Sequence, residues 1–306
     1  MAVVINTNVD SLKIQSLLTN STNKMSSTMQ KMSSGLKILS AKDDAAGTVI
    51  SAKMQVQLNG NQIAQKNVQN ANALLSTAEG NLDVVEDNIS RIRDLTLQAK
   101  NGTYSEEEIK AMQDEVEQRI AEIDRINNSA EYSSLRLFGD GGDNPVGLAA
   151  KGATFQVGAD AGVDNTIVAD KALFDKVTFS ALTGIGTTKF SLSDLAENDG
   201  SFSATGVASK GTDEVDFDTA IRALDNAINN ITDRKSIIGS TGNRMDSALS
   251  TLTTQFENLS SAKSIITDAD VAAEASTFTQ QQILQQVSTS LLAQANQAPS
   301  IALSLV

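Results

Sequence analysis

The residues that could carry catalysis in this chain are few and lack their usual companions. A Ser-x-x-Lys spacing, which in some hydrolases pairs a serine nucleophile with a lysine, occurs at Ser21 with Lys24 and at Ser34 with Lys37. The Ser-Asp-Asn and Lys-Thr-Gly motifs that accompany it in those enzymes are both missing. There is no histidine and no cysteine, so the common nucleophile–base pairs, thiolate metal sites and disulfides are excluded. We therefore predict no enzyme, no catalytic residue and no cofactor.

Four acidic residues form a cluster ahead of a helical pattern: Asp213, Glu214, Asp216 and Asp218. Carboxylates at short spacing can bind a hard cation, but the glycine and the final glutamate of a calcium loop are absent here. An aspartate at the start of a helix caps its free N–H groups, and Asp216 or Asp218 is expected to do so. The sequence therefore predicts no metal site.

Charge and hydropathy exclude several classes of partner. The 306 residues include 24 Lys and Arg against 37 Asp and Glu, a formal charge of −13, which disfavours nucleic acid and anionic membranes as main partners. No run of about 18 apolar residues could cross a bilayer, so we predict no membrane insertion. The amino terminus has neither the basic nor the long apolar region of a secretory signal. Composition leaves a cytoplasmic protein, or one exported without a cleaved signal.

Two helical arms flank a middle segment of different character. Residues 1–138 hold five of the 19 glycines, whereas residues 139–218 hold 12. Apolar residues recur every 3.5 positions from 64 to 92, and again from 217 to 259 with two interruptions. A repeat of 3.5 residues sustained over this length is typical of a coiled-coil seam. The sequence predicts a mostly α fold: a long antiparallel coiled-coil bundle formed by both chain ends, with a small β-rich insertion.

Shorter patterns predict individual elements within this plan. Ser105 followed by Glu108 has the spacing of a capping box, and apolar residues from Ile109 to Ile123 continue it as a helix. In the middle segment, Ala153–Val157 and Lys176–Ser180 alternate like β-strands.

The chain ends are apolar on one side and uncharged on the other. No residue after Glu274 is charged, and the polar face there consists of Gln, Ser, Thr and Asn. Amides and hydroxyls can be buried in pairs at far lower cost than ionised groups. We infer that both ends become ordered by contacting each other and neighbouring copies, and that outside such contacts they are largely unstructured. The residues expected to drive this self-assembly are Leu18, Met25, Met29, Met32, Leu36, Ile283, Leu284, Val287, Leu291 and Leu292.

Four segments together resemble bacterial flagellin. They are Ser33–Ile38, Ser40–Gly47, Ser90–Thr103 and Gln294–Gln297. The resemblance covers roughly residues 3–138 and 217–306, and the middle is only loosely similar.

The resemblance implies a division into three parts. Residues 1–44 with 263–306 would form a terminal coiled-coil domain that lines the filament channel. Residues 45–138 with 217–262 would form a helical rod domain, and residues 139–216 the Gly-rich, acidic insertion that supplies its β-hairpin and outer surface. A channel lining without charge would offer nothing to trap an unfolded subunit on its way to the growing tip.

The resemblance also implies function, location and partners. The chain would be a structural subunit that self-assembles into the extracellular flagellar filament for motility, after export without a cleaved signal. Its partners would be other copies, an export chaperone, the filament cap and the hook-junction proteins. Asp43, Asp44 and Gly47 match the family's motif turn. Arg91, Leu95 and Glu115 match positions at which many flagellins are recognised by an innate immune Toll-like receptor.

Three rival interpretations remain at this point. A hook–filament junction protein shares the terminal helices and the rod, but the 43–47 and 294–297 motifs look like filament flagellin. A type III secreted translocator is also helical, but it needs long apolar helices that this chain lacks. A flagellin with a metallopeptidase insertion needs His-Glu-x-x-His, which a chain without histidine cannot supply.

Overall fold

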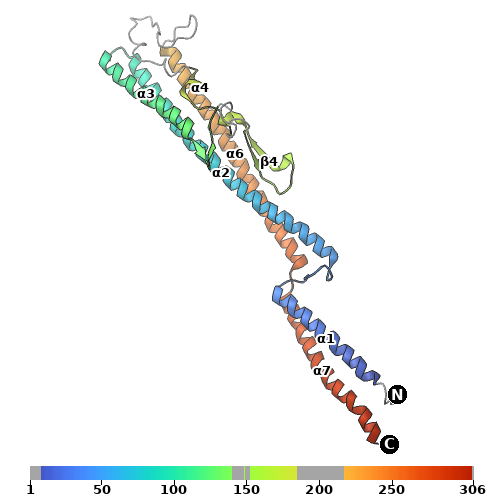
Figure 1. Ribbon diagram of the computed structural model, residues 1–306. Helices are drawn as coiled ribbons and strands as arrows, with labels where there is room; N and C mark the ends of the chain where they lie inside the picture. Colours follow the sequence, from blue (N-terminus) through green and yellow to red (C-terminus); the bar gives the residue numbers. More distant parts are fainter. Residues whose placement is uncertain (1–7, 140–147, 149–151, 185–216, 305–306) are drawn as a thin grey trace. The chain divides into compact units, whose positions relative to one another are not determined.

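The computed structural model describes residues 8–139, 148, 152–184 and 217–304 (Figure 1). The chain divides by its contacts into two units, residues 1–59 with 255–306 and residues 60–254. Five long or medium helices dominate the described residues: α1 (Val9–Ser34), α2 (Ala45–Lys100), α3 (Glu106–Ser129), α6 (Phe217–Thr267) and α7 (Val271–Ser304). This confirms the predicted mostly α fold. The three-part division expected from the resemblance stays a prediction.

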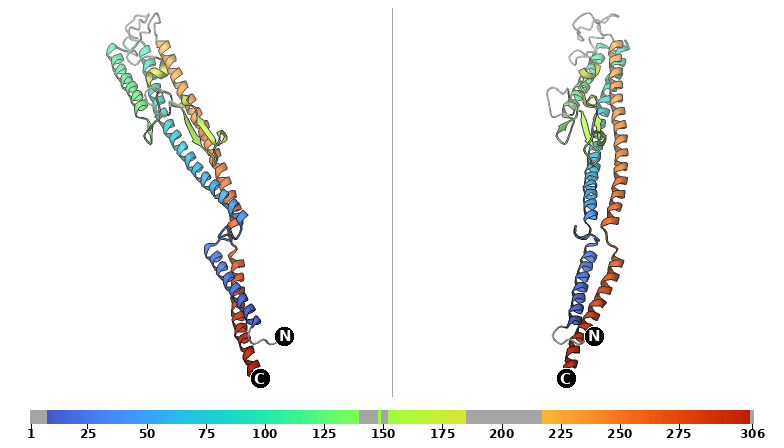
Figure 2. Two further views of the ribbon diagram at one scale, coloured as in Figure 1. Left: turned by 45° about the vertical axis from the view of Figure 1, so that its right-hand side comes forward. Right: turned by 90° about the vertical axis from the view of Figure 1, so that its right-hand side faces the viewer.

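The first unit is built on the antiparallel pairing of α1 with α7, the two ends of the chain. Figure 2 shows these helices side by side in both views. Asn8 caps α1 by accepting from the Ser11 N–H, and Gly35 ends it at φ 71°, a left-handed conformation that glycine adopts without strain. Beyond the cap, the Lys37 N–H donates to the Thr267 carbonyl at 2.7 Å, which ties the connection after α1 to the end of α6.

The second unit has its core along the predicted α2 stripe. Every member of that stripe from Ala64 to Ile92 is buried, which confirms the heptad interpretation. On α6 the fully buried positions include Leu224, Ile231 and Met245 of the predicted stripe. The α6 stripe is interrupted at Lys235, whose ammonium contacts Asp83 at 2.6 Å and Glu86 at 2.9 Å on α2, and these hydrogen bonds raise its pKa.

Further polar pairs set the register of the two antiparallel helices in this unit. Arg93 binds Asp225 at 2.5 Å, and Asn72 donates to Asp246 at 2.8 Å. Lys100 pairs with Asp218, which lies inside the first turn of α6. Asp218 is therefore an ion-pair partner and not the residue that precedes the helix. The other acids of that predicted cluster lie outside the described residues.

The third helix of the second unit begins as predicted. The Ser105 hydroxyl accepts from the Glu108 N–H while the Glu108 carboxylate accepts from the Ser105 N–H, which is the capping box. After α3 the chain turns in a two-residue hairpin, β1 (Glu131–Tyr132) with β2 (Leu135–Arg136). Its turn residues, Ser133 and Ser134, both have positive φ, as hairpin turns of this length require. The sequence predicts a helical arm over these residues instead, because serine carries no strong signal for a positive φ.

The described part of the insertion contains one β-hairpin. Strand β3 (Ala153–Gln156) pairs antiparallel with β4 (Thr166–Ala169), which confirms the first predicted strand. The two strands are joined through a 3₁₀ turn, η2 (Val163–Asn165), and a second 3₁₀ turn, η3 (Lys171–Phe174), follows.

The prediction of a second strand over residues 176–180 is wrong. Helix α4 (Phe179–Thr183) begins inside it, and the Val177 N–H donates to the Asn127 side chain at 2.9 Å instead of to a neighbouring strand. Val177 and Phe179 are both fully buried, so their alternation reflects packing onto the helices rather than a sheet.

Candidate functional site: the paired terminal helices

The contact between α1 and α7 is polar at its centre. The Ser21 hydroxyl donates to the main-chain oxygen of Gln281 at 2.9 Å, and both residues are buried, at 5% and 8% exposure. Thr28 on α1 and Ser288 on α7 are buried in the same seam. At the open end of the pair, the Asn8 side-chain amide donates to the Ala295 carbonyl at 2.8 Å. The hydrogen bonds made by Ser21 and Asn8 between the helices offset the loss of water by these two side chains.

Several large apolar side chains of α7 are exposed within this chain. Ile283 and Val287, predicted to drive self-assembly, are 54% and 48% exposed, and Leu284 and Leu291 are also exposed. On α1, Met29 and Leu36 are exposed as well. Large apolar residues on two helices that already share a polar seam form an uncovered surface. The remaining predicted residues, Leu18, Met25, Met32 and Leu292, are half-buried between the helices.

Sequence reasoning missed two exposed leucines on α1, Leu12 and Leu17. Leu17 and Leu18 are consecutive, and neighbouring positions on a helix lie about 100° apart, so one is exposed while the other is half-buried toward α7. The adjacent pair was a usable signal, because a helix with a single apolar face seldom needs two leucines in sequence.

The motif turn between α1 and α2 is organised by two aspartates. The Asp43 carboxylate accepts from the N–H groups of Ser40 at 3.0 Å and Leu39 at 3.1 Å, and these hydrogen bonds lower its pKa. Asp44 caps α2 by accepting from the Gly47 N–H at 2.9 Å. A Cβ on Gly47 would lie 2.7 Å from the Cδ1 of Ile38, so a side chain at 47 would have to displace its neighbours. The three residues therefore act as one tight turn at the start of α2.

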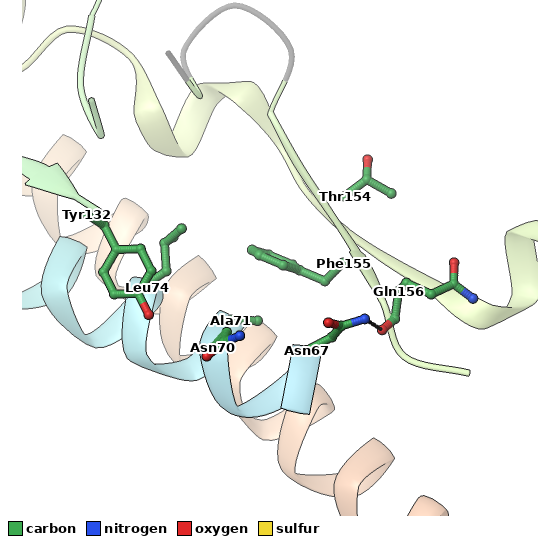
Figure 3. A pocket seen from close by; sticks show the side chains of 8 residues that line it. All are labelled: Asn67, Asn70, Ala71, Leu74, Tyr132, Thr154, Phe155 and Gln156. Carbon is green, nitrogen blue, oxygen red and sulfur yellow. Dashed lines mark hydrogen bonds between the residues drawn. The ribbon is translucent and has the colours of Figure 1, made fainter. Parts of the chain in front are cut away.

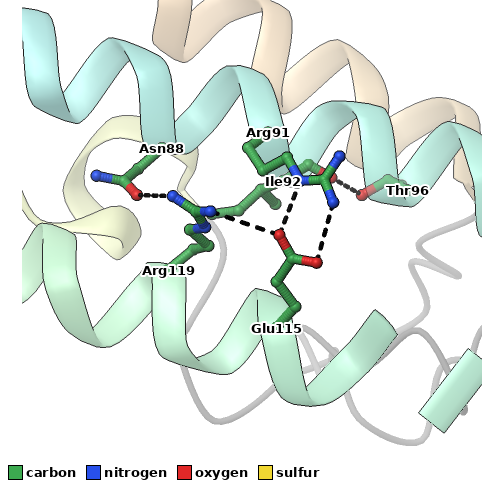
Figure 4. Close-up of polar contacts among 6 residues, drawn as sticks. All are labelled: Asn88, Arg91, Ile92, Thr96, Glu115 and Arg119. Atoms are coloured by element: carbon green, nitrogen blue, oxygen red, sulfur yellow. Dashed lines mark hydrogen bonds and ion pairs between the residues drawn. The ribbon is translucent and has the colours of Figure 1, made fainter. Parts of the chain in front are cut away.

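The residues matched to receptor recognition lie on α2 and α3 of the second unit, and Figure 4 shows two of them, Arg91 and Glu115. Arg91 donates from Nε and Nη2 to the two carboxylate oxygens of Glu115 at 2.7 and 3.0 Å. Arg119 approaches the same carboxylate at 3.5 Å and donates to the Asn88 side chain at 3.1 Å. The bidentate bond raises the pKa of Arg91 and lowers that of Glu115. Leu95 lies in the core at 2% exposure.

A hollow of about 330 Å³ separates the β3–β4 hairpin from one face of α2 (Figure 3). Tyr132 and Phe155 lie on either side of it, and its floor contains Ala71 and Leu74. The Asn67 amide donates to the Gln156 carbonyl at 3.4 Å, which attaches the hairpin to the helix. None of the residues predicted for assembly or recognition lines this hollow.

Comparison with known proteins identifies the family to which these helices belong. The bacterial flagellin N-terminal helical region matches residues 5–141, and the bacterial flagellin C-terminal helical region matches residues 221–306. The flagellin of Bacillus subtilis (strain 168) is 34% identical over 309 residues, covering 99% of both chains. The flagellin of Halalkalibacterium halodurans is 33% identical, covering 99% of this chain and all of its own.

A solved structure supports the fold. A putative flagellar hook-associated protein from Vibrio parahaemolyticus aligns over 73% of this chain and 99% of its own with a TM-score of 0.56, at 17% identity. That likeness concerns the fold alone. In the part of the chain that the structure describes, every helix is too short or too polar to cross a membrane. Both helical regions of one structural, non-enzymatic family are present in the expected order, and the chain belongs to the bacterial flagellin family.

Proposed function

We propose that this chain self-assembles into the extracellular flagellar filament through the outward faces of α1 and α7. The observation that carries this proposal is the polarity of their pairing, in which Ser21 and Gln281 face inward while Ile283 and Val287 face solvent. Covering a half-exposed aliphatic side chain is worth about 1 kcal/mol. A set of such residues repeated along two helices supplies a driving force that exists only between copies.

The roles that we propose for the three parts of the chain in the filament are those that the resemblance to flagellin implies. Residues 1–44 with 263–306 line the channel, residues 45–138 with 217–262 form the rod, and residues 139–216 lie outermost. The absence of charge after Glu274 supports the channel role, because a neutral polar lining does not bind a passing chain electrostatically. Gln294 is exposed, so Gln294→Lys adds a charge there with little strain on the monomer. Shortened filaments are expected from that variant, and filaments of unchanged length would contradict the channel role.

The partners proposed besides other copies are an export chaperone, the filament cap and the hook-junction proteins. All three kinds of protein would contact the terminal helices, either before assembly or at the ends of the filament. The exposed leucines and isoleucines of α1 and α7 support this, because a subunit in transit has to keep the same faces covered.

The experiment that tests assembly uses the full chain and two variants. Sulfate strengthens apolar burial and screens the −13 charge, so the unaltered chain is expected to form filaments in it, seen by electron microscopy. The double variant Ile283→Gln with Val287→Gln removes two of the exposed apolar side chains of α7 and should stay monomeric. Val163→Gln, at a residue 87% exposed in the other unit, is the matched control and should form filaments normally. Normal filaments from the double variant would overturn the proposal.

Recognition by a host Toll-like receptor is proposed as a second function, supported by the Arg91–Glu115 pair. Their side chains are 42% and 34% exposed and are held rigidly by the bidentate bond, which favours a defined contact. In this proposal Leu95 supports α2 from the core and does not touch the receptor.

The receptor proposal has a matched control on α3, the helix that carries Glu115. Glu122 and Arg125 form another carboxylate–guanidinium pair on α3. In reporter cells that express the receptor, Arg91→Ala should reduce signalling at least about tenfold, which corresponds to a lost contact of about 1.4 kcal/mol. Arg125→Ala should leave signalling unchanged. Equal effects of the two variants would contradict a specific role for Arg91.

A further inference from the structure

The chain contains two Asn–Gly dipeptides, 59–60 and 101–102, in opposite surroundings. In this dipeptide the glycine nitrogen can attack the asparagine side-chain carbonyl, because glycine has no Cβ in the way and its backbone turns freely. Whether the attack occurs depends on how tightly the surrounding backbone is held. The two copies therefore form an internal comparison within one molecule.

Asn101 and Gly102 lie in an open turn. Helix α2 ends at Lys100 and α3 begins at Glu106, and both residues of the dipeptide are exposed. Among the hydrogen bonds of the described residues, Thr103 N–H donates to the Asn101 carbonyl at 2.5 Å, but the Gly102 N–H donates none. A Cβ added to Gly102 would meet no atom within 4 Å. The nucleophilic nitrogen is thus unpaired and has room around it.

Asn59 and Gly60 are held within a helix. Both lie inside α2, where the amide of Gly60 is part of the helical hydrogen-bond ladder. A Cβ on Gly60 would lie 2.7 Å from that of Ala159, so the segment after β3 packs directly on this glycine. Attack at this position requires the helix and the packed segment to open first.

We propose that Asn101 is a site of spontaneous deamidation, at which the side-chain amide is converted to a carboxylate as the protein ages. The Gly102 nitrogen forms a bond to Asn101 Cγ, the bond from Cγ to the side-chain nitrogen breaks, and ammonia leaves with the proton that Gly102 gives up. Water then opens the resulting succinimide at either carbonyl and yields aspartate or isoaspartate. The net change is loss of ammonia and gain of water, with no oxidation or reduction.

The new charge falls at an unfavourable place in the fold. A carboxylate at the carboxyl end of the 56-residue helix α2 faces the negative end of the helix dipole. It also lies close in sequence to the acidic first turn of α3, formed by Glu106, Glu107 and Glu108. Lys100, the neighbouring cation, already pairs with Asp218. The modification therefore loosens the α2–α3 connection and makes the chain more acidic by one charge.

The test is ageing of the purified full chain in mildly alkaline buffer, followed by digestion and mass spectrometry of the two peptides. The Asn101 peptide should gain about 1 Da at least about tenfold faster than the Asn59 peptide, because only the latter needs local opening. Isoelectric focusing should show an acidic band that grows in parallel.

Two further measurements separate structural control from sequence alone. In denaturant, the two peptides should convert at similar rates, because the dipeptide is the same. Gly102→Ala fits the fold, since its Cβ meets nothing within 4 Å, and it should slow conversion at Asn101 without changing the melting temperature. Equal rates at Asn59 and Asn101 in the folded chain, or unchanged conversion in Gly102→Ala, would overturn the proposal.

Discussion

Ser21 on α1 and Gln281 on α7 meet through a buried hydrogen bond of 2.9 Å between the serine hydroxyl and the glutamine carbonyl. The fully buried residues of this pair are therefore polar, whereas its apolar side chains are half-buried, as Leu18 is, or exposed, as Val287 is. A pair held in this way is weaker than one with a continuous leucine seam, because a hydrogen bond contributes about 1 kcal/mol net and the apolar side chains between these helices are only half-buried.

The first prediction follows from that weakness. Ser288→Leu places an apolar group in the buried seam and should stabilise the α1–α7 pair by about 1–2 kcal/mol. Slower hydrogen exchange of the α7 amides would measure it. Ser290, two residues away and exposed, supplies the control: Ser290→Leu should leave the exchange rates unchanged. Equal slowing by both variants would show that helix propensity, and not the seam, sets the rates.

The second prediction concerns the motif turn. Gly47→Ala brings a Cβ within 2.5 Å of Asp44 Oδ2 and 2.7 Å of Ile38, so either the cap of α2 or the packing of Ile38 has to shift. A loss of about 1–3 kcal/mol in unfolding free energy is expected from overpacking of this kind. Gly80→Ala is the control within the same helix, because a Cβ there meets nothing within 4 Å.

That control should stabilise the protein by about 0.5–1 kcal/mol, as glycine-to-alanine changes do inside helices. Thermal unfolding followed by circular dichroism measures both variants. If Gly47→Ala also raises the melting temperature, crowding does not explain why glycine stands at position 47.

The third prediction concerns Asn127. Its buried side chain binds a backbone N–H of the insertion that a neighbouring strand would bind in a sheet. Its side-chain oxygen accepts from the buried Val177 N–H at 2.9 Å. Asn127→Ala leaves that N–H without a partner and should cost about 1–3 kcal/mol. The neighbouring Asn128 is exposed, and Asn128→Ala should cost clearly less. Urea unfolding of the two variants and the unaltered chain decides between these outcomes.

The fourth prediction is a pH dependence that originates at Glu115. Its bond to Arg91 lowers the pKa below the ordinary value of 4.5, so the folded state holds the ionised form more strongly than the unfolded state does. The stabilisation is complete above pH 4.5 and is lost as the pH falls through the lower, folded value. Because both side chains are partly exposed, the contribution is below about 1 kcal/mol.

Glu115→Gln should therefore be slightly less stable at neutral pH, and its melting temperature should fall less between neutral and acidic buffer. Parallel acid titrations of the two proteins measure this difference. Identical slopes would place the origin of the acid sensitivity elsewhere, for example at Asp268, whose pKa is lowered by hydrogen bonds from Ser264 and Thr267.

Local and periodic features of this protein were determined by the sequence alone. The 3.5-residue repeat specifies the seam from Ala64 to Ile92, because only one side of a helix keeps that phase. The capping box at Ser105 is a contact between residues three apart, so it too can be predicted without knowing which distant segments pack against it. The absence of histidine and cysteine likewise restricts the chemistry whatever the fold.

Tertiary structure decided every choice between partners distant in sequence. Arg91 could have paired with its neighbour Asp94, but packing of α3 against α2 presents Glu115, 24 residues away. The 176–180 segment alternates like a strand, yet Asn127 takes its N–H at Val177 and α4 follows. On α7 both faces are free of charge over the described side chains after Glu274, so periodicity does not say which is inward. Contact with α1 places Ser288 inside and Val287 outside, because the fully buried residues that α1 contributes to this seam, Ser21 and Thr28, are also small and polar.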